Sequence, residues 1–113
     1  MEFFESPAFS RHYREYLSDD EYRLLQAALS ANPTMGDVMP GTGGFRKVRW
    51  ADPRRGKGRR GGLRLIYYSF LAENQIWLMT IYDKSEMADL SAAERKALRE
   101  AIGMESKSRK RGK

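Results

Sequence analysis

The stretch "LRLIYYSFLAENQIWLMTIY", residues 63–82, decides the fold class. Its two halves are apolar at nearly every position and rich in aromatic and β-branched side chains, as is typical of buried strands. A short polar turn around Glu73 and Asn74 separates them. We therefore expect residues 63–71 and 75–82 to be the central strands of a sheet that is covered on at least one side.

The segment just upstream, "RKVRW" at residues 46–50, has the two-residue alternation of a strand with one cationic face. Its apolar residues point to one side, whereas Lys47 and Arg49 point to the other. The connection "ADPRRGKGRRGG" links this strand to the next one, which begins near Arg64. If the two strands pair antiparallel, Arg64 lies at the root of the same cationic surface.

Three further segments, residues 6–17, 18–31 and 90–103, carry helix signals. Their start signals are Ser6 followed by Pro7, a capping box of Ser18 and Glu21, and a capping box of Ser91 and Glu94. Their stop signals include Asn32 with Pro33 for the second helix and Gly103 for the third.

With a short strand at "MEFF", the expected order of elements is β-α-α-β-β-β-α. Helices then pack on a small antiparallel-rich sheet, which is an α+β architecture. We expect the segment "PTMGDVMPGTGG", residues 33–44, to be a loop. Residues 1–103 are expected to form a single domain, and the basic segment 104–113 is expected to be a disordered tail.

Positive charge is concentrated in one central block of the chain. The net charge is +6, and residues 41–72 contain nine basic side chains against one acidic side chain. A field concentrated in this way attracts phosphate. The chain has no cysteine, no apolar run long enough to cross a membrane and no signal-peptide pattern at its start. We therefore expect a cytoplasmic protein that does not enter membranes.

Four cations and a phenol are expected to converge at one end of the sheet, namely Lys47, Arg49, Arg64, Lys84 and Tyr82. Each of them also has a structural interpretation. Lys47 and Arg49 could be solvated surface, Arg64 could pair with Asp83 or Glu86, Lys84 could form a surface ion pair, and Tyr82 could pack in the core. The remaining basic side chains of the block are candidates for contacts with an RNA backbone: Arg46, Arg54, Arg55, Lys57, Arg59 and Arg60.

Several chemistries are excluded by residue type. His12 is the only histidine, so a two-histidine ribonuclease site is impossible. The acidic residues lie mostly at helix starts, so we expect no metal site, and the glycines match no nucleotide-binding fingerprint, so we expect no cofactor. A site of lysine and arginine suits RNA, because the ribose 2′-hydroxyl supplies the nucleophile. Lysine can take its proton, and arginine can hold the phosphoryl oxygens.

Four segments, in this order, resemble the RelE/HigB superfamily of bacterial type II toxins, and most closely its HigB-like branch: "SDDEYRLLQAAL", "NPTMGDVMPGTGGFRKVRW", "GKGRRGGLRLIYY" and "LMTIYDKSEMADLSAAERKAL". The resemblance covers about residues 15 to 100. It implies a compact sheet with two N-terminal helices and a C-terminal helix. It also implies a ribosome-dependent endoribonuclease that binds the ribosomal A site, cuts mRNA there without a metal and thereby inhibits translation.

The resemblance also assigns roles and partners. The paired basic positions of the family fall on Lys47 and Arg49, the arginine that opens the next strand on Arg64, and the basic residue after the last strand on Lys84. Some members use a C-terminal tyrosine, which the segment "EMADLS" lacks, so either Tyr82 replaces it or lysine and arginine perform all proton transfers. The implied partners are the ribosome with its mRNA and a cognate antitoxin, HigA-like with a helix-turn-helix domain.

Two other functions are compatible with the same residues. A non-catalytic module could use the basic block 46–64 only to neutralise the phosphates of RNA or DNA. A protein-interaction domain could present its cationic surface to an acidic partner. Within the enzyme hypothesis, Lys47 or Lys84 is the general base, Arg64 clamps the scissile phosphate, and Arg49 stabilises charge or protonates the leaving 5′-oxygen.

Overall fold

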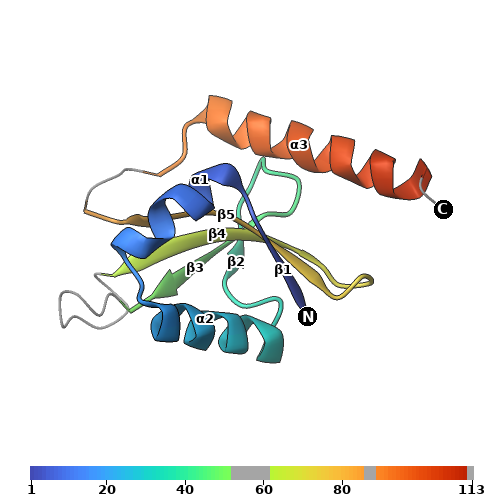
Figure 1. Ribbon diagram of the computed structural model, residues 1–113. Coiled ribbons are helices and arrows are strands. Elements are labelled where there is room, and N and C mark those ends of the chain that lie inside the picture. Colours follow the sequence, from blue (N-terminus) through green and yellow to red (C-terminus); the bar gives the residue numbers. More distant parts are fainter. Residues whose placement is uncertain (52–61, 86–88, 112–113) are drawn as a thin grey trace.

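The computed structural model describes residues 1–51, 62–85 and 89–111, and Figure 1 shows the arrangement of their elements. In chain order these are β1 (Glu2–Glu5), α1 (Pro7–His12), a 3₁₀ turn (Tyr13–Glu15), α2 (Asp19–Ala31), β2 (Asp37–Val38), β3 (Arg46–Trp50), β4 (Leu63–Phe70), β5 (Gln75–Asp83) and α3 (Ala92–Arg111). The α+β class is confirmed. The expected order is also confirmed, except that a two-residue strand, β2, lies in the segment that we expected to be a loop.

The five strands form one sheet in the order β1-β5-β4-β3-β2. β1 is parallel to β5, and every other neighbouring pair is antiparallel. β4 is the middle strand, in agreement with its apolar sequence, and it forms a hairpin with β5 as expected. Asn74 closes this hairpin with φ at 56°, a left-handed conformation that asparagine tolerates better than most residues.

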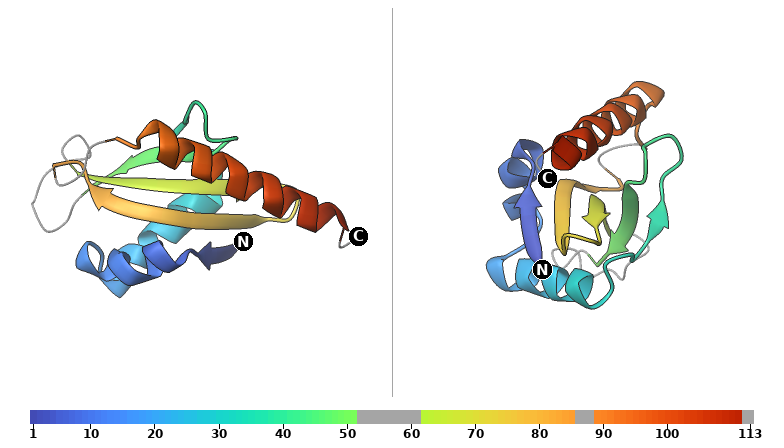
Figure 2. Two further views of the ribbon diagram at one scale, coloured as in Figure 1. Left: turned by 90° about the horizontal axis from the view of Figure 1, so that it is seen from above. Right: turned by 90° about the vertical axis from the view of Figure 1, so that its right-hand side faces the viewer.

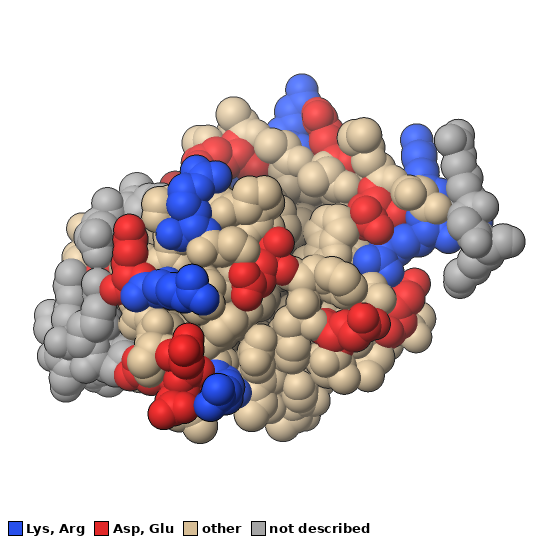
Figure 3. Space-filling model, viewed as in Figure 1, with Lys and Arg blue, Asp and Glu red and all other residues tan. Residues whose placement is uncertain are grey.

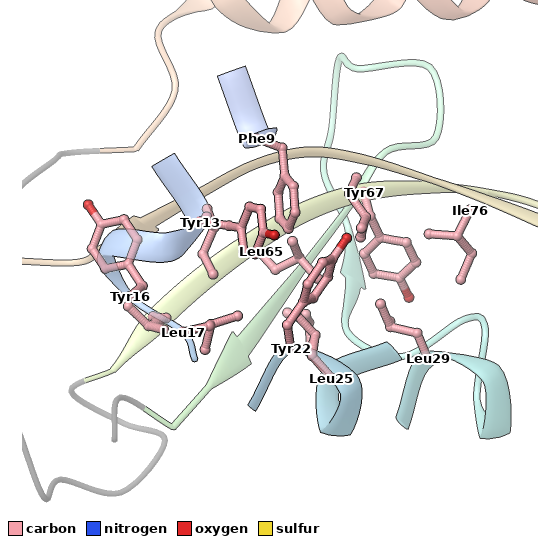
Figure 4. Close-up of a cluster of buried hydrophobic side chains, with 14 residues drawn as sticks. Phe9, Tyr13, Tyr16, Leu17, Tyr22, Leu25, Leu29, Leu65, Tyr67 and Ile76 are labelled. Carbon is pink, nitrogen blue, oxygen red and sulfur yellow. The ribbon is translucent and has the colours of Figure 1, made fainter. Parts of the chain in front are cut away.

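The first core lies between the sheet and the N-terminal helices. In Figure 1, α2 lies below the sheet and α3 above it, while both views in Figure 2 place α1 beside β5. Leu25 and Leu29 of α2 point toward Leu65 and Tyr67 of β4 (Figure 4), and all four are completely buried. The second core lies on the opposite face of the sheet, where Ile102 of α3 joins a cluster with side chains from β4 and β5.

The helix starts are those expected from the sequence. Ser18 and Glu21 form the capping box of α2, in which the Glu21 N–H donates to Ser18 Oγ at 3.2 Å and the Ser18 N–H donates to Glu21 Oε1 at 2.7 Å. The same reciprocal pair joins Ser91 and Glu94 at the start of α3. The Glu94 N–H donates to Ser91 Oγ at 3.1 Å, and the Ser91 N–H donates to Glu94 Oε1 at 2.8 Å. These bonds satisfy backbone donors that have no partner inside the helix, and so they determine where each helix begins.

The predicted stop at Gly103 is wrong, because α3 continues to Arg111 and includes residues that we expected to be a disordered tail. A tertiary contact holds this last part of the helix. The Arg109 guanidinium lies 3.7 Å from the ring centre of Phe70, and its Nη1 donates to Gln75 Oε1 at 2.8 Å. A cation over an aromatic face is a favourable contact, so the β4–β5 hairpin anchors the end of α3. Within the described residues, no helix has the length and apolar character needed to cross a bilayer.

Candidate active site

A row of polar side chains crosses three adjacent strands on the sheet face that carries α3. In the strand register, Arg49 of β3 lies opposite Arg64 of β4, and Arg64 lies opposite Tyr82 of β5. Directly paired residues share one face of a sheet, and residues two apart on a strand share it as well. Lys47 is two residues before Arg49 on β3 and therefore belongs to the same face. The antiparallel pairing expected from the sequence thus brings Lys47, Arg49, Arg64 and Tyr82 to one face.

Arg64 is unusual because it is a buried cation. Only 5% of the residue is exposed, and its Nη1 donates to the carbonyl oxygens of Gly62 and Leu63 at 3.5 and 3.3 Å. These are long bonds, and within the described ranges no ion pair joins Arg64 to a carboxylate. Asp83, one of the two carboxylates suggested as its partner, lies opposite Leu63 and so belongs to the other face. The other one, Glu86, lies outside the described residues.

Lys47 is held by a carboxylate on the segment that leads into α3. Its Nζ lies 2.9 Å from Asp89 Oδ1, a contact between residues 42 positions apart in the chain. This hydrogen bond and the Lys47 charge lower the pKa of Asp89 below its ordinary value, and the charges of Arg95 and Arg64 lower it further. Asp89 therefore lies within the electrostatic field of three of the site's cations.

A groove of about 700 Å³ opens beside β3 and gives solvent access to this face. One wall is formed by residues 35–40, and Lys47, Val48, Arg49 and Arg95 line the remainder. Arg95, in the first turns of α3, donates through Nη1 to the carbonyl oxygen of Pro40 at 2.8 Å. This bond joins the start of α3 to the loop before β3, so that the helix contributes a cation to the groove.

Tyr82 contributes a buried phenol. Its hydroxyl oxygen has no hydrogen-bond partner among the residues that the structure describes. Burial raises the pKa of Tyr82, the negative charge of Asp89 raises it further, and Arg64 and Arg95 act in the opposite direction. The phenol thus stays protonated at neutral pH. Buried hydroxyls are nearly always hydrogen-bonded, so the Tyr82 hydroxyl is a polar group that the described residues leave unsatisfied.

Lys84 comes directly after β5 and is exposed. Its backbone N–H donates to the carbonyl oxygen of Gly62 at 3.5 Å, and Gly62 precedes Arg64 by two residues, so Lys84 lies beside the start of β4. The structure thus keeps Lys84 at the same end of the sheet as the row of polar side chains, as expected from the sequence.

A match to a known family agrees with this fold. Residues 1–111 match the family model described as the RelE toxin of the RelE/RelB toxin–antitoxin system. The chain belongs to the RelE toxin family. The matched range ends at residue 111, where α3 also ends. The α+β architecture, with a mixed sheet between α2 and α3, agrees with a RelE-like fold.

Two residues of this candidate site were not identified from the sequence. Asp89 and Arg95 reach the site through contacts between distant parts of the chain, and no local pattern marks them. Asp89 is part of the segment "EMADLS", which drew notice in the sequence only for its lack of a tyrosine. Among the described residues, no group of three or more acidic, histidine or cysteine side chains could hold a metal ion.

Arg46 lies on the face opposite to Lys47 and Arg49. Its guanidinium donates to the carbonyl oxygens of Thr34 and Gly36 at 3.0 and 3.2 Å, so it holds the wall of the groove in this RelE-family chain. Strand alternation alone could have indicated this placement. The other candidate RNA contacts, Arg54, Arg55, Lys57, Arg59 and Arg60, fall in the part of the chain that the structure does not describe.

The charge on the opposite side of the molecule is mixed. On the face shown in Figure 3, which has α1 in front, acidic and basic side chains are interspersed. The cations that share a face with Tyr82 are therefore a local feature of the RelE-type sheet around β3 and β4, and do not reflect a uniformly basic surface.

The Lys47–Asp89 pair leads to a titration prediction. Because its pKa is lower in the folded protein, Asp89 contributes stability at pH values above its ordinary pKa, and this contribution is lost as the pH falls through the folded pKa. We expect Lys47→Met to raise the pKa of Asp89 toward its ordinary value, as followed by an NMR titration of the side-chain carboxyl. Lys96→Met, which removes a more distant ammonium paired with Glu100 at 3.9 Å, is the control. An unchanged Asp89 midpoint in Lys47→Met would contradict the ion pair.

Proposed function

We propose that this protein is the toxin of a type II toxin–antitoxin system and acts as an endoribonuclease. It cuts mRNA in the A site of the ribosome by metal-independent attack of a ribose 2′-hydroxyl, and so inhibits translation. The observation that carries the proposal is the row of Arg49, Arg64 and Tyr82, with Lys47 beside it, on one face of a RelE-type sheet.

This arrangement suits a phosphodiester. Arginine presents several N–H donors in a fixed planar fork, which matches two oxygens of a phosphoryl group. Arg64 is buried, lies opposite the groove residue Arg49 in the strand register and has only long bonds to backbone carbonyls, so its donors suit a stronger acceptor. In the proposed mechanism Arg64 clamps the scissile phosphate, and Arg49 stabilises the charge that develops on it. Preorganised donors of this kind are usually the largest contribution to catalysis at such sites.

Proton transfers complete the mechanism. The 2′-hydroxyl proton must be accepted as that oxygen bonds to phosphorus, and the leaving 5′-oxygen must receive a proton. Lys47 and Lys84 are the candidates for the acceptor. Lys47 already donates to Asp89, which favours Lys84 or a Lys47 released from that contact. Tyr82, whose pKa is raised by burial, is protonated and suits the role of donor to the 5′-oxygen, as an alternative to Arg49.

Two kinds of partner follow from this function. The ribosome supplies the substrate, and the exposed cations around β3 suit its RNA backbone. The second partner is a cognate antitoxin, and we propose a HigA-like protein with a helix-turn-helix domain.

The test is a reconstituted translation reaction with purified protein, in which transcript ends are mapped by primer extension. We expect new 5′ ends within codons at the A site, together with a fall in protein synthesis. Intact mRNA and normal protein synthesis would remove the proposal. A reaction without ribosomes is the control, and there we expect the transcript to remain intact.

A further inference from the structure

The carboxylate of Asp89 lies against the ammonium of Lys47, one of the cations proposed to act on the RNA. One of its oxygens accepts a hydrogen bond from Lys47 at 2.9 Å. The charges of Arg64 and Arg95 also stabilise its ionised form, so three cations from β3, β4 and α3 act on one carboxylate. Two of these cations, Lys47 and Arg95, line the groove, and Arg64 lies opposite the groove residue Arg49 in the strand register.

A carboxylate and a phosphodiester are alike in the features that these cations recognise. Both carry a single negative charge at neutral pH, and both present two oxygens that accept charge-assisted hydrogen bonds. The ammonium of Lys47 has only three N–H donors, and two anions at one place repel each other. An RNA phosphate that approaches Lys47 therefore competes directly with Asp89.

The position of Asp89 is not explained by the needs of the fold. The start of α3 is already capped by the reciprocal bonds of Ser91 and Glu94. The Asp89 side chain is 69% exposed, and ion pairs with an exposed partner contribute little to stability. A carboxylate that is dispensable for the helix, yet bonded to a basic residue of the site, is better explained by a role at the site.

We propose that Asp89 is a built-in counter-anion, which occupies the phosphate-binding position of Lys47 in the free protein and is displaced by RNA. The identity of the displacing anion rests on the proposed function. Displacement frees the Lys47 ammonium for a phosphoryl oxygen, and the exposed Asp89 side chain moves into solvent. The Lys47–Asp89 pair is partly exposed, so breaking it costs little free energy. Asp89 therefore weakens RNA binding moderately and does not block it.

The test measures binding separately from cleavage. The probe is a fluorescently labelled RNA hexanucleotide with 2′-O-methyl riboses, which cannot be cut by 2′-oxygen attack, and its affinity is read by fluorescence anisotropy. We expect Asp89→Asn to bind it about two- to fivefold more tightly than the wild type, the range expected for a partly exposed ion pair. Asp20→Asn is the matched control, because it removes the same charge from an exposed position on α2.

A second comparison isolates the Lys47 contact. In a Lys47→Met background, Asp89→Asn should no longer tighten binding relative to Asp20→Asn, because the two changes act on one interaction. Equal affinities of Asp89→Asn and Asp20→Asn in the wild-type background would overturn the proposal. So would a persistent tightening without Lys47. Thermal melts of all variants ensure that each comparison is made on folded protein.

These experiments separate failure of the counter-anion proposal from failure of the ribonuclease proposal. If the wild type leaves transcripts intact during translation but Asp89→Asn tightens binding of the probe, the counter-anion stands and the ribonuclease proposal fails. If the wild type cuts transcripts and Asp89→Asn lowers cleavage with unchanged affinity for the probe, Asp89 takes part in the chemistry and the counter-anion proposal fails.

Discussion

Arg64→Ala is expected to reduce mRNA cleavage in a translation reaction by at least about 100-fold, while ribosome binding largely survives. Removal of one preorganised donor to a developing negative charge typically costs about 100- to 1,000-fold in rate. Arg64 is buried between Arg49 and Tyr82 in the strand register, so no mobile surface side chain can take its place. Cleavage is followed by primer extension, and ribosome binding by co-sedimentation.

The control for this prediction is Arg23→Ala, which removes an exposed arginine paired with Asp20 at 3.1 Å on α2. It should cut mRNA at close to the wild-type rate. Arg64→Lys, which keeps the charge and loses the planar fork, should be strongly impaired. Circular dichroism verifies that each variant is folded. The contrary result is that Arg64→Ala cuts as well as Arg23→Ala, and that only the slope of log binding affinity against log salt concentration falls, by about one. Arg64 would then be an ordinary phosphate contact, and the non-catalytic interpretation would be correct.

Leu65→Ala should cost about 2–5 kcal/mol of unfolding free energy, measured by urea denaturation. Leu65 is in the middle strand, is completely buried and packs against the N-terminal helices (Figure 4). Its removal leaves a cavity that a close-packed core cannot fill. This is a large share of the stability of a domain of this size.

The comparison variant is Leu24→Ala, at a position on α2 that is 65% exposed. It should change the unfolding free energy by less than about 0.5 kcal/mol. Similar costs for the two leucines would show that β4 is not the centre of the core, and the register that brings Arg64 beside Arg49 and Tyr82 would then lose its support.

The elements that could be predicted are those whose signals are local. The hairpin of β4 and β5 follows from an apolar, β-branched composition, and the starts of α2 and α3 follow from capping boxes that the structure contains. Alternation along β3 and antiparallel pairing with β4 were sufficient to bring Lys47, Arg49 and Arg64 to one face.

The elements that were missed depend on contacts between distant residues. β2 has only two residues, and it pairs because Gly36 lets the chain approach β3 closely: a Cβ there would lie 2.4 Å from the Lys47 carbonyl oxygen. Gly103 resembled a helix stop, yet α3 passes through it because Arg109 packs on Phe70. Asp89 was missed because its partner, Lys47, lies 42 positions away in the chain.

The most direct measurement of the mechanism is made on the fragments that the translation reaction produces. Two transcripts are compared, one fully ribose and one with a single 2′-deoxy nucleotide on the 5′ side of the scissile bond in the A-site codon. If Lys47, Arg49 and Arg64 promote attack by the 2′-hydroxyl, the first transcript is cut to leave a 2′,3′-cyclic phosphate and a 5′-hydroxyl, and the second stays intact. Equal cutting of both transcripts at that bond would mean that another nucleophile is used, and would contradict the mechanism.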